Sequence, residues 1–365
     1  MDLVVKGEFR KRALALHEEC PVVDAHLDLA GEIKIRKKLG EREIIRRRYL
    51  RNWRKAGLNL IVSSIYVHND VLQRGGVPAA WEDALSQIKA LNREIENTGE
   101  LMAVRNRNDL QKAVSGEKIG VLVYMEGLDC IGEDLGRLSG LYDLGVRGAS
   151  LTWSRRNALA SGCCKAGQRI QIRGGLTELG RRAVHEMERL SLFLDVSHLN
   201  DDGFEDVKRI AERPFCATHS CAKAVYDNYR NLTDEQMEAL ASQGGVMGLN
   251  GCKYIAGSLS GNHLEMLCRH AEYEVRRMGG AYVGFGFDLC DSYDAAKAEL
   301  HDTDQARRGQ SAEKRETELC DCLPDHGSIP LLSAALLQRG MDEETVRGIM
   351  GGNFIRYFEK ILPKK

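Results

Sequence analysis

Short apolar runs alternate with amphipathic segments along most of the chain. Each run is four to eight residues long and mostly apolar, as expected of parallel strands that are buried on both faces. This pattern predicts eight strands, at residues 22–25, 60–67, 119–124, 148–152, 192–196, 215–218, 245–249 and 282–287.

The segments between these runs have the apolar spacing of helices that pack against a sheet. Thr233 precedes one of them, with Gln236 three residues later, which predicts a capping box. Eight strands that alternate with helices favour a (β/α)8 barrel over residues 1–365 as one domain. A doubly wound sheet is the alternative, but no glycine-rich loop follows the first run. Helices are expected at residues 81–95, 135–144, 178–190, 202–211, 234–242, 265–278, 328–338 and 342–359.

Two segments depart from the simple barrel. Residues 31–56, after the first strand, are rich in Lys and Arg, which permits a nucleic-acid or membrane patch. Apolar residues such as Ile33, Ile44 and Trp53 favour a helical insertion with a solvated basic face instead. Residues 289–324, after the eighth strand, are polar and long for a connection, so we expect a mobile loop, either a lid over the barrel mouth or simple disorder.

Composition narrows the class of protein. The 365 residues hold 52 Lys and Arg against 53 Asp and Glu, a net charge of −1, which argues against a dedicated nucleic-acid binder. No apolar run approaches the ~20 residues that span a bilayer, and the N-terminal segment has no apolar core of a signal peptide. The 11 cysteines are an odd number, and we interpret them as reduced thiols of a cytoplasmic protein without membrane contact.

Ionisable residues gather where the predicted strands end. In a parallel barrel these ends meet at one face, which is where active sites form. Burying several carboxylates and imidazoles together is unfavourable without a counter-charge, and a divalent metal ion provides one. The residues at these ends are Asp24, His26, Asp28, Glu126, Thr152, Trp153, Ser154, Asp195, His198, His219 and Asp288.

Their spacing supports a metal site. His26 and Asp28 are two apart, so both point to one side of a strand and can chelate one ion. His198 and His219 follow neighbouring strands and can hold a second ion, and Glu126 can bridge two ions about 3.5–4 Å apart. Imidazole and carboxylate suit zinc, although manganese, cobalt or iron also fit.

The remaining histidines and the cysteines offer weaker patterns. Cys163-Cys164 and Cys320-x-Cys322 lack the Cys-x2-Cys spacing of a structural zinc site, so we interpret them as ordinary thiols. The other histidines show no comparable spacing and are interpreted as structural: His17, His68, His185, His263, His270, His301 and His326.

Seven short blocks, in order and over nearly the whole chain, resemble the membrane (renal) dipeptidase family of zinc metallopeptidases, within the amidohydrolase-like barrels. The blocks are VVDAHLDL at 22–29, YMEGLD at 124–129, LDVSHLN at 194–200, ATHSCAKAV at 217–225, YRNLTDEQ at 229–236, YVGFGFD at 282–288 and GGNFIRYF at 351–358.

The resemblance implies a site of two zinc ions, a small dipeptide as substrate and a homodimer. It implies that His26 and Asp28 bind one ion, that Glu126 bridges, and that His198 and His219 bind the other. It further assigns Arg230 to the C-terminal carboxylate of the substrate, which a guanidinium binds through two parallel hydrogen bonds. Asp288 corresponds to the general acid/base of the family.

Two departures from the family pattern concern the substrate. Trp153 stands where better-known members have a histidine that polarises the scissile carbonyl, and Trp carries no charge. Arg155, Arg156 or Asn157 are the candidates to replace that histidine, unless metal alone suffices. The chain also reads Asp288-Leu289-Cys290-Asp291 where the family usually has Asp-Phe-Asp-Gly.

The expected function is zinc-dependent hydrolysis of L,L and possible L,D dipeptides by a metal-bridging hydroxide. The alternative is a related metal-dependent amidohydrolase that acts on N-acyl amino acids, lactams or lactones. A metal-binding barrel without catalysis is a third hypothesis, which only Trp153 and the altered segment after Asp288 favour.

Overall fold

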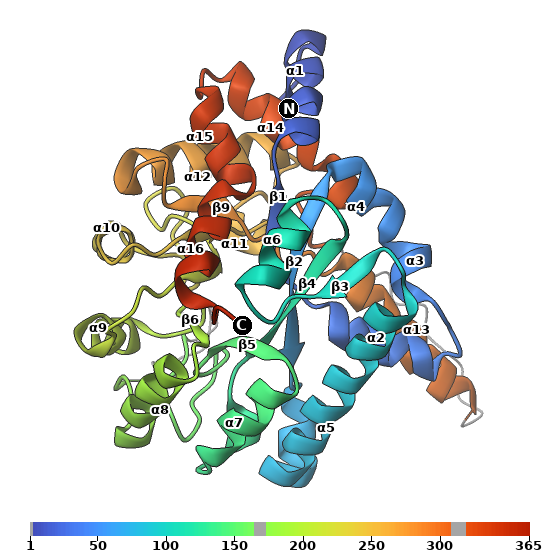
Figure 1. The fold of residues 1–365 in the computed structure, drawn as a ribbon, viewed down its shortest axis with the longest axis vertical. Coiled ribbons are helices and arrows are strands. Elements are labelled where there is room, and N and C mark those ends of the chain that lie inside the picture. Colours follow the sequence, from blue (N-terminus) through green and yellow to red (C-terminus); the bar gives the residue numbers. More distant parts are fainter. Residues whose placement is uncertain (1–2, 164–172, 308–318) are drawn as a thin grey trace.

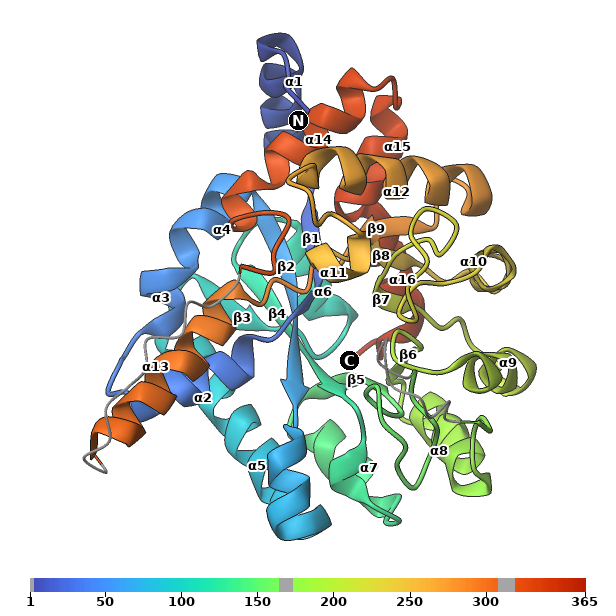
Figure 2. The same ribbon diagram turned by 180° about the vertical axis from the view of Figure 1, so that it is seen from behind.

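The strands form two parallel sheets that lie edge to edge and together curl around the core (Figures 1 and 2). The computed structural model describes residues 3–163, 173–307 and 319–365. One sheet has the order β1-β2-β4-β5-β6, with β3 paired to β4, and the other has the order β7-β8-β9. The strands are β1 (Val22–Leu27), β2 (Leu58–Tyr66), β3 (Leu101–Ala103), β4 (Ile119–Glu126), β5 (Val146–Ser150), β6 (Phe193–Asp195), β7 (Ala217–Ser220), β8 (Met247–Leu249) and β9 (Val283–Phe285).

Backbone hydrogen bonds connect the two sheets at both of their junctions. Between β6 and β7, the amide of Val196 donates to the carbonyl of Cys216 at 2.8 Å. Between β9 and β1, the amide of Asp288 donates to the carbonyl of His26 at 3.1 Å. Every predicted strand overlaps an observed one, so the α/β fold with a parallel sheet is confirmed, whereas β3 was not predicted.

Helices cover the outer face of the curled sheet (Figures 1 and 2). The predicted capping box is present, since Thr233 Oγ1 accepts from the Gln236 amide at 3.3 Å and the Gln236 side chain accepts from the Thr233 amide at 2.9 Å. None of the helices in the described ranges combines the length and apolar character needed to cross a membrane. The helices outside the two unusual segments are α1 (Gly7–Glu19), α5 (Asn69–Asn97, broken at Gly76), α6 (Arg107–Val114), α7 (Gly136–Asp143), α8 (Glu178–Arg189), α9 (Asp201–Ile210), α10 (Asp234–Ser242), α11 (Lys253–Ala256), α12 (His263–Met278), α14 (Ile329–Gln338), α15 (Glu343–Arg347) and α16 (Asn353–Ile361), with a π-helical turn at Gly348–Gly352.

Most of residues 31–56 are helical, as the sequence predicts. They form most of α2 (Leu29–Lys38), with α3 (Ile44–Arg48) and α4 (Leu50–Ala56). The apolar residues face inward: Ile33, Ile44, Ile45 and Trp53 are fully buried. Several basic side chains of this segment pair with carboxylates. Arg46 and Arg54, for example, both contact Glu100.

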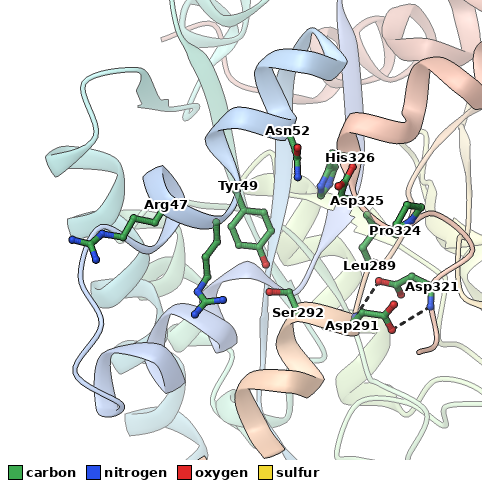
Figure 3. Close-up of a pocket in the computed structure, with 11 residues that line it drawn as sticks. Arg47, Tyr49, Asn52, Leu289, Asp291, Ser292, Asp321, Pro324, Asp325 and His326 are labelled. Carbon is green, nitrogen blue, oxygen red and sulfur yellow. Dashed lines mark hydrogen bonds between the residues drawn. The ribbon is translucent and has the colours of Figure 1, made fainter. Parts of the chain in front are cut away.

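The prediction of a loop over residues 289–324 was wrong for its first half. Residues Asp291–Arg307 form α13, which packs along α2. The Asp321 carboxylate accepts the amides of Cys290 and Asp291 at 2.9 and 3.0 Å and thereby caps the helix, and Figure 3 shows Asp291 and Asp321 facing each other. The many charged residues suggested a loop, but Tyr293 and Ala296 are buried and provide an apolar face. Residues 308–318 lie outside the described ranges.

Close packing of backbones along β8 gives a prediction about stability. A Cβ atom at Gly248 would lie 2.0 Å from the carbonyl oxygen of Thr218 in β7, so Gly248→Ala forces the two strands apart. We expect a loss of about 1–3 kcal/mol in the free energy of unfolding, measured by urea denaturation. Gly99→Ala is the control, since no atom lies within 4 Å of the added carbon, and equal stability of the two variants would contradict the packing argument.

Candidate metal centre and substrate pocket

The candidate site lies at the carboxyl ends of the parallel strands. His26 lies in β1 and Asp28 follows it, while Glu126 is the last residue of β4. His198 follows β6, His219 lies in β7 and Asp288 follows β9. Six side chains from segments far apart in sequence therefore reach one end of the sheet.

Three imidazoles converge on one carboxylate oxygen. The Nε2 atoms of His198, His219 and His26 lie 2.8, 3.5 and 3.7 Å from Glu126 Oε1. The Nε2 atoms of His198 and His219 are 2.9 Å apart. His26 Nε2 also lies 3.9 Å from Asp28 Oδ1 and 3.8 Å from Asp288 Oδ1, so the five predicted ligands and Asp288 form one cluster.

Hydroxyl groups around the cluster orient the imidazoles. The Thr218 hydroxyl donates to Asp195 Oδ2 at 2.7 Å, so its oxygen accepts from His219 Nδ1 at 2.8 Å and leaves Nε2 with a lone pair. Ser154 Oγ lies 3.0 Å from His198 Nδ1 in the same way. Such hydrogen bonds at the far nitrogen are typical of histidines that bind metal.

His26 provides the test of whether this cluster fits a metal ion. Its side chain is fully buried, and its Nε2 has no hydrogen-bond partner among the described residues. Buried polar atoms are normally paired, so this nitrogen, aimed at three carboxylates, has the position of a ligand atom. His26, Glu126 and His219 offer ligand atoms within 4.8 Å of one another, and the donor set fits a divalent ion.

The shifted pKa values of the imidazoles and carboxylates in the cluster also favour a bound metal ion. Burial, and then the Arg230 charge, lowers the pKa of His26 to about 3, and burial lowers the pKa of His198 and His219 far below the usual value. Burial and the charge of Asp28 raise the pKa of both Glu126 and Asp288 well above the usual range. Neutral imidazoles beside carboxylates that lack a counter-charge form a site that a dication stabilises.

A pocket of about 310 Å³ opens over the cluster. Arg230 lies at its wall, is 4% exposed and donates from Nη2 to the His219 carbonyl at 3.1 Å. Trp153 also lines the pocket, and the centroid of its ring lies 5.2 Å from the ring centroid of Tyr66 and 5.5 Å from that of His198. The full lining is Asp28, Tyr66, His68, Glu126, Trp153, Ser154, His198, Tyr229, Arg230, Ile255, Asp288, Cys290, Tyr293, Asp294 and Lys297.

The candidates to replace the missing histidine do not reach this pocket. The Asn157 amide donates to the Leu151 carbonyl at 2.9 Å and accepts from the Leu159 and Ala160 amides, so it shapes its own loop. Arg155 lies behind Trp153, where it binds Asp129 at 3.0 Å. Arg156 is hydrogen-bonded to the carbonyl of Arg173 at 3.3 Å.

Sequence reasoning missed several residues of the site. Tyr293, Asp294 and Lys297 lie on α13, which was expected to be a loop. Tyr66 ends β2, and its place at a strand end is the signal that would have found it. His68, interpreted as structural, also lines the pocket, whereas His326 keeps a structural role, since its Nε2 lies 2.9 Å from Asp24 Oδ2 and supports β1.

The fold and the site together define a class, namely α/β proteins whose parallel strands end in a buried, metal-compatible cluster of histidines and carboxylates. Comparison with known families then identifies the family. The model of the membrane dipeptidase family, peptidase family M19, matches residues 10–308, and the chain belongs to this family of peptide hydrolases.

Known relatives agree with this assignment. The chain is 27% identical to mouse Dipeptidase 3 over 96% of its own length and 66% of that protein, so it spans about two thirds of this relative. Two solved structures superpose with a TM-score of 0.78 over 94% of this chain and 99% of theirs. One is a metallopeptidase, dipeptidase AC, at 27% identity, and the other is a Rhodobacter sphaeroides metallopeptidase bound to a phosphinate mimic of L-Ala-D-Ala, at 26%.

Proposed function

We propose that this protein is a metal-dependent dipeptidase that hydrolyses L,L and L,D dipeptides with two divalent metal ions, and that these ions are Zn²⁺. The observation that supports this most is the convergence of three buried Nε2 atoms on Glu126 Oε1 beneath a pocket that contains Arg230. The pocket volume of about 310 Å³ suits a ligand of dipeptide size. The related peptidase bound to an L-Ala-D-Ala mimic supports the inclusion of D residues.

In this proposal the ligands divide into two sets around a shared carboxylate. His26 and Asp28 would hold one ion, His198 and His219 would hold the other, and Glu126 would be the carboxylate that the two sets share. Bound divalent ions supply Lewis-acid polarisation of the peptide carbonyl and lower the pKa of a water nucleophile. The Ser64 hydroxyl donates to Asp28 Oδ1 and the Ser154 and Thr218 hydroxyls hold His198 and His219, so the ligands are oriented before an ion binds.

Asp288 is the proposed proton carrier. Its carboxylate faces the pocket and lies 3.8 Å from His26 Nε2, while Asn250 Nδ2 donates to its Oδ2 at 3.3 Å. It accepts a proton from the attacking water and returns it to the nitrogen of the leaving amine as the C–N bond breaks.

Arg230 is the proposed site for the free carboxylate of the substrate. Its Nη1 is buried and has no hydrogen-bond partner among the described residues, whereas Nη2 is held by the His219 carbonyl. A guanidinium fixed on one side with an unused donor at the pocket wall is arranged to bind an anion. Binding the terminal carboxylate there restricts substrates to short peptides.

Substituting Arg230 gives the corresponding prediction. In Arg230→Lys the planar pair of donors is lost, and we expect KM for a dipeptide to rise about 10- to 100-fold, the range for a hydrogen bond to a charged group, with kcat less affected. Steady-state kinetics with a dipeptide and its C-terminal amide measures this. Replacing the terminal carboxylate of the dipeptide by an amide should raise KM for the wild type but change KM little for the variant. Arg156→Lys is the matched control. An equal KM in variant and wild type would contradict the role.

The first experiment for the overall function is hydrolysis of a panel of L,L and L,D dipeptides by zinc-loaded protein, with a chelator-treated control. Chelator-sensitive release of amino acids is expected, and it would also show that Trp153 is compatible with turnover. N-acyl amino acids, lactams and lactones form the second arm. Turnover only in that arm would replace the dipeptidase by an amidohydrolase.

The closure of the barrel and the oligomeric state also belong to the proposal. We infer that the two sheets close into an eight-stranded barrel, because the β6–β7 and β9–β1 junctions are both hydrogen-bonded. A homodimer is expected from the family resemblance, and analytical ultracentrifugation tests it.

A further inference from the structure

A second group of metal-ligand side chains lies outside the candidate active site. Cys221 directly follows β7, while His270 and Glu274 are one turn apart on α12 and therefore lie on the same face of that helix. The three side chains offer ligand atoms within 4.8 Å of one another. All three residues have zero exposure to solvent.

Glu274 is the unexplained member of this group. Neither of its carboxylate oxygens has a hydrogen-bond partner among the described residues, although the side chain is completely buried. Leaving a buried carboxylate without a partner is strongly unfavourable. Burial raises its pKa well above the usual range, opposed only in part by the nearby Ala222 amide.

His270 is oriented like a metal-binding histidine. Its Nε2 lies 3.1 Å from the carbonyl oxygen of Ala256, which only accepts, so this nitrogen carries the proton. Nδ1 therefore has the lone pair that accepts a hydrogen bond from the Ala222 amide at 3.2 Å, and a metal ion that binds this nitrogen must displace that amide. A backbone carbonyl that fixes the tautomer from behind is the usual support for an imidazole ligand. Burial also lowers the pKa of His270 to about 4, so the ring is neutral.

We propose that Cys221, His270 and Glu274 bind a divalent metal ion of the zinc type in a structural site separate from the candidate active site. Thiolate sulfur, imidazole nitrogen and carboxylate oxygen are the ligand types that zinc takes in proteins. Two anionic ligands and one neutral ligand offset a charge of +2, so the complete unit is uncharged. On binding, the thiol and the carboxyl group each release one proton to solvent.

The neighbourhood offers a fourth ligand and a reason for the site. The Cys221 thiol donates to the carbonyl oxygen of Asn250 at 3.5 Å, and this oxygen becomes free to act as a fourth ligand when the thiol loses its proton. The Cys221 carbonyl accepts the Leu232 amide at 2.9 Å, which closes the loop that contains Arg230. A metal ion at this position would tie α12 to that loop and hold Arg230 in place.

Cobalt substitution tests the proposal directly. The proposed active-site ligands include no thiol, so thiolate-to-cobalt charge-transfer absorption in the near ultraviolet reports a cysteine ligand elsewhere. We expect this absorption in cobalt-loaded wild type and its loss in Cys221→Ser. Cys290→Ser is the control, because Cys290 Sγ lies 3.5 Å from Asp288 Oδ1 and is therefore a thiol beside the active-site carboxylates. Absorption that persists in Cys221→Ser would overturn the site.

Metal content provides the second readout. By elemental analysis of the folded protein, Cys221→Ser and Glu274→Gln should each contain one cobalt per chain fewer than the wild type, while Glu272→Gln on the same helix should match it. The amide of Glu274→Gln has nearly the same shape as the carboxyl group, so this variant serves if Cys221→Ser does not fold. Equal content in Glu274→Gln and the wild type would mean that Glu274 is a neutral buried acid and not a ligand. Because only a difference is measured, the result is independent of how many ions the active site holds.

Discussion

Replacing Asp288 by Asn is expected to lower kcat for dipeptide hydrolysis at least about 100-fold while metal content stays that of the wild type. The amide retains the size of the carboxyl group, and one of its atoms can still contact Asn250, which lies 3.3 Å from Asp288 Oδ2. What it cannot do is accept a proton from water and return it to the amine nitrogen. Steady-state kinetics and elemental analysis of the same preparation measure both quantities.

Asp294→Asn is the matched control for this substitution. Asp294 is a carboxylate of the same pocket but lies on α13, where it pairs with Lys297 at 2.5 Å. This variant should keep most of the wild-type kcat. Normal turnover in Asp288→Asn would refute the proton-transfer role, and loss of metal in that variant would reassign Asp288 as a ligand.

Replacing Glu126 by Gln is expected to remove metal ions and activity together. Glu126 Oε1 lies within 4 Å of three imidazole nitrogens, and no other carboxylate oxygen in the cluster has that position. Loss of a residue that only supports a ligand typically lowers metal affinity or activity 10- to 100-fold, so loss of the shared ligand should exceed about 100-fold. Elemental analysis after dialysis and kinetics at fixed zinc concentration test this.

Glu94→Gln is the control for burial of a glutamate. Glu94 is also buried, but its carboxylate contacts Lys37 at 3.3 Å and accepts from the Ile45 amide at 3.4 Å, and neither group binds metal. It should lose stability without losing metal. Full metal content in Glu126→Gln would show that Glu126 is not a ligand, and the proposed two-ion site would then be wrong.

Residues that follow from periodicity could be predicted from the sequence. A buried parallel strand is a short apolar run, and its last polar residues must lie at the edge of the sheet. That rule is enough to bring His26, Glu126, His198, His219 and Asp288 to one place, and the structure does so. It does not reveal which nitrogen of each imidazole faces the cluster, because that depends on Ser154 and Thr218.

Residues whose role depends on packing could not be predicted in this way. The charged segment at 291–307 reads as a loop until its apolar face meets α2, and only then do Tyr293, Asp294 and Lys297 become pocket residues. Asn157 was a candidate to replace the family histidine because it lies close to Trp153 in the sequence, yet its amide is used by neighbouring backbone groups. In both cases the role of the residue depends on the group that it contacts, and the spacing of residues in the sequence does not identify that group.

The sequence by itself determined the parallel α/β fold, the ends of the strands and the family, because alternation of apolar runs and helices and the short motifs at strand ends are local properties of the chain. Tertiary structure alone decided that His26 Nε2 is left without a partner, that Arg230 has one unused donor, and that Glu274 is buried beside Cys221 and His270. These facts depend on contacts between residues tens to hundreds of positions apart, which burial and hydrogen bonding create only when the sheet curls.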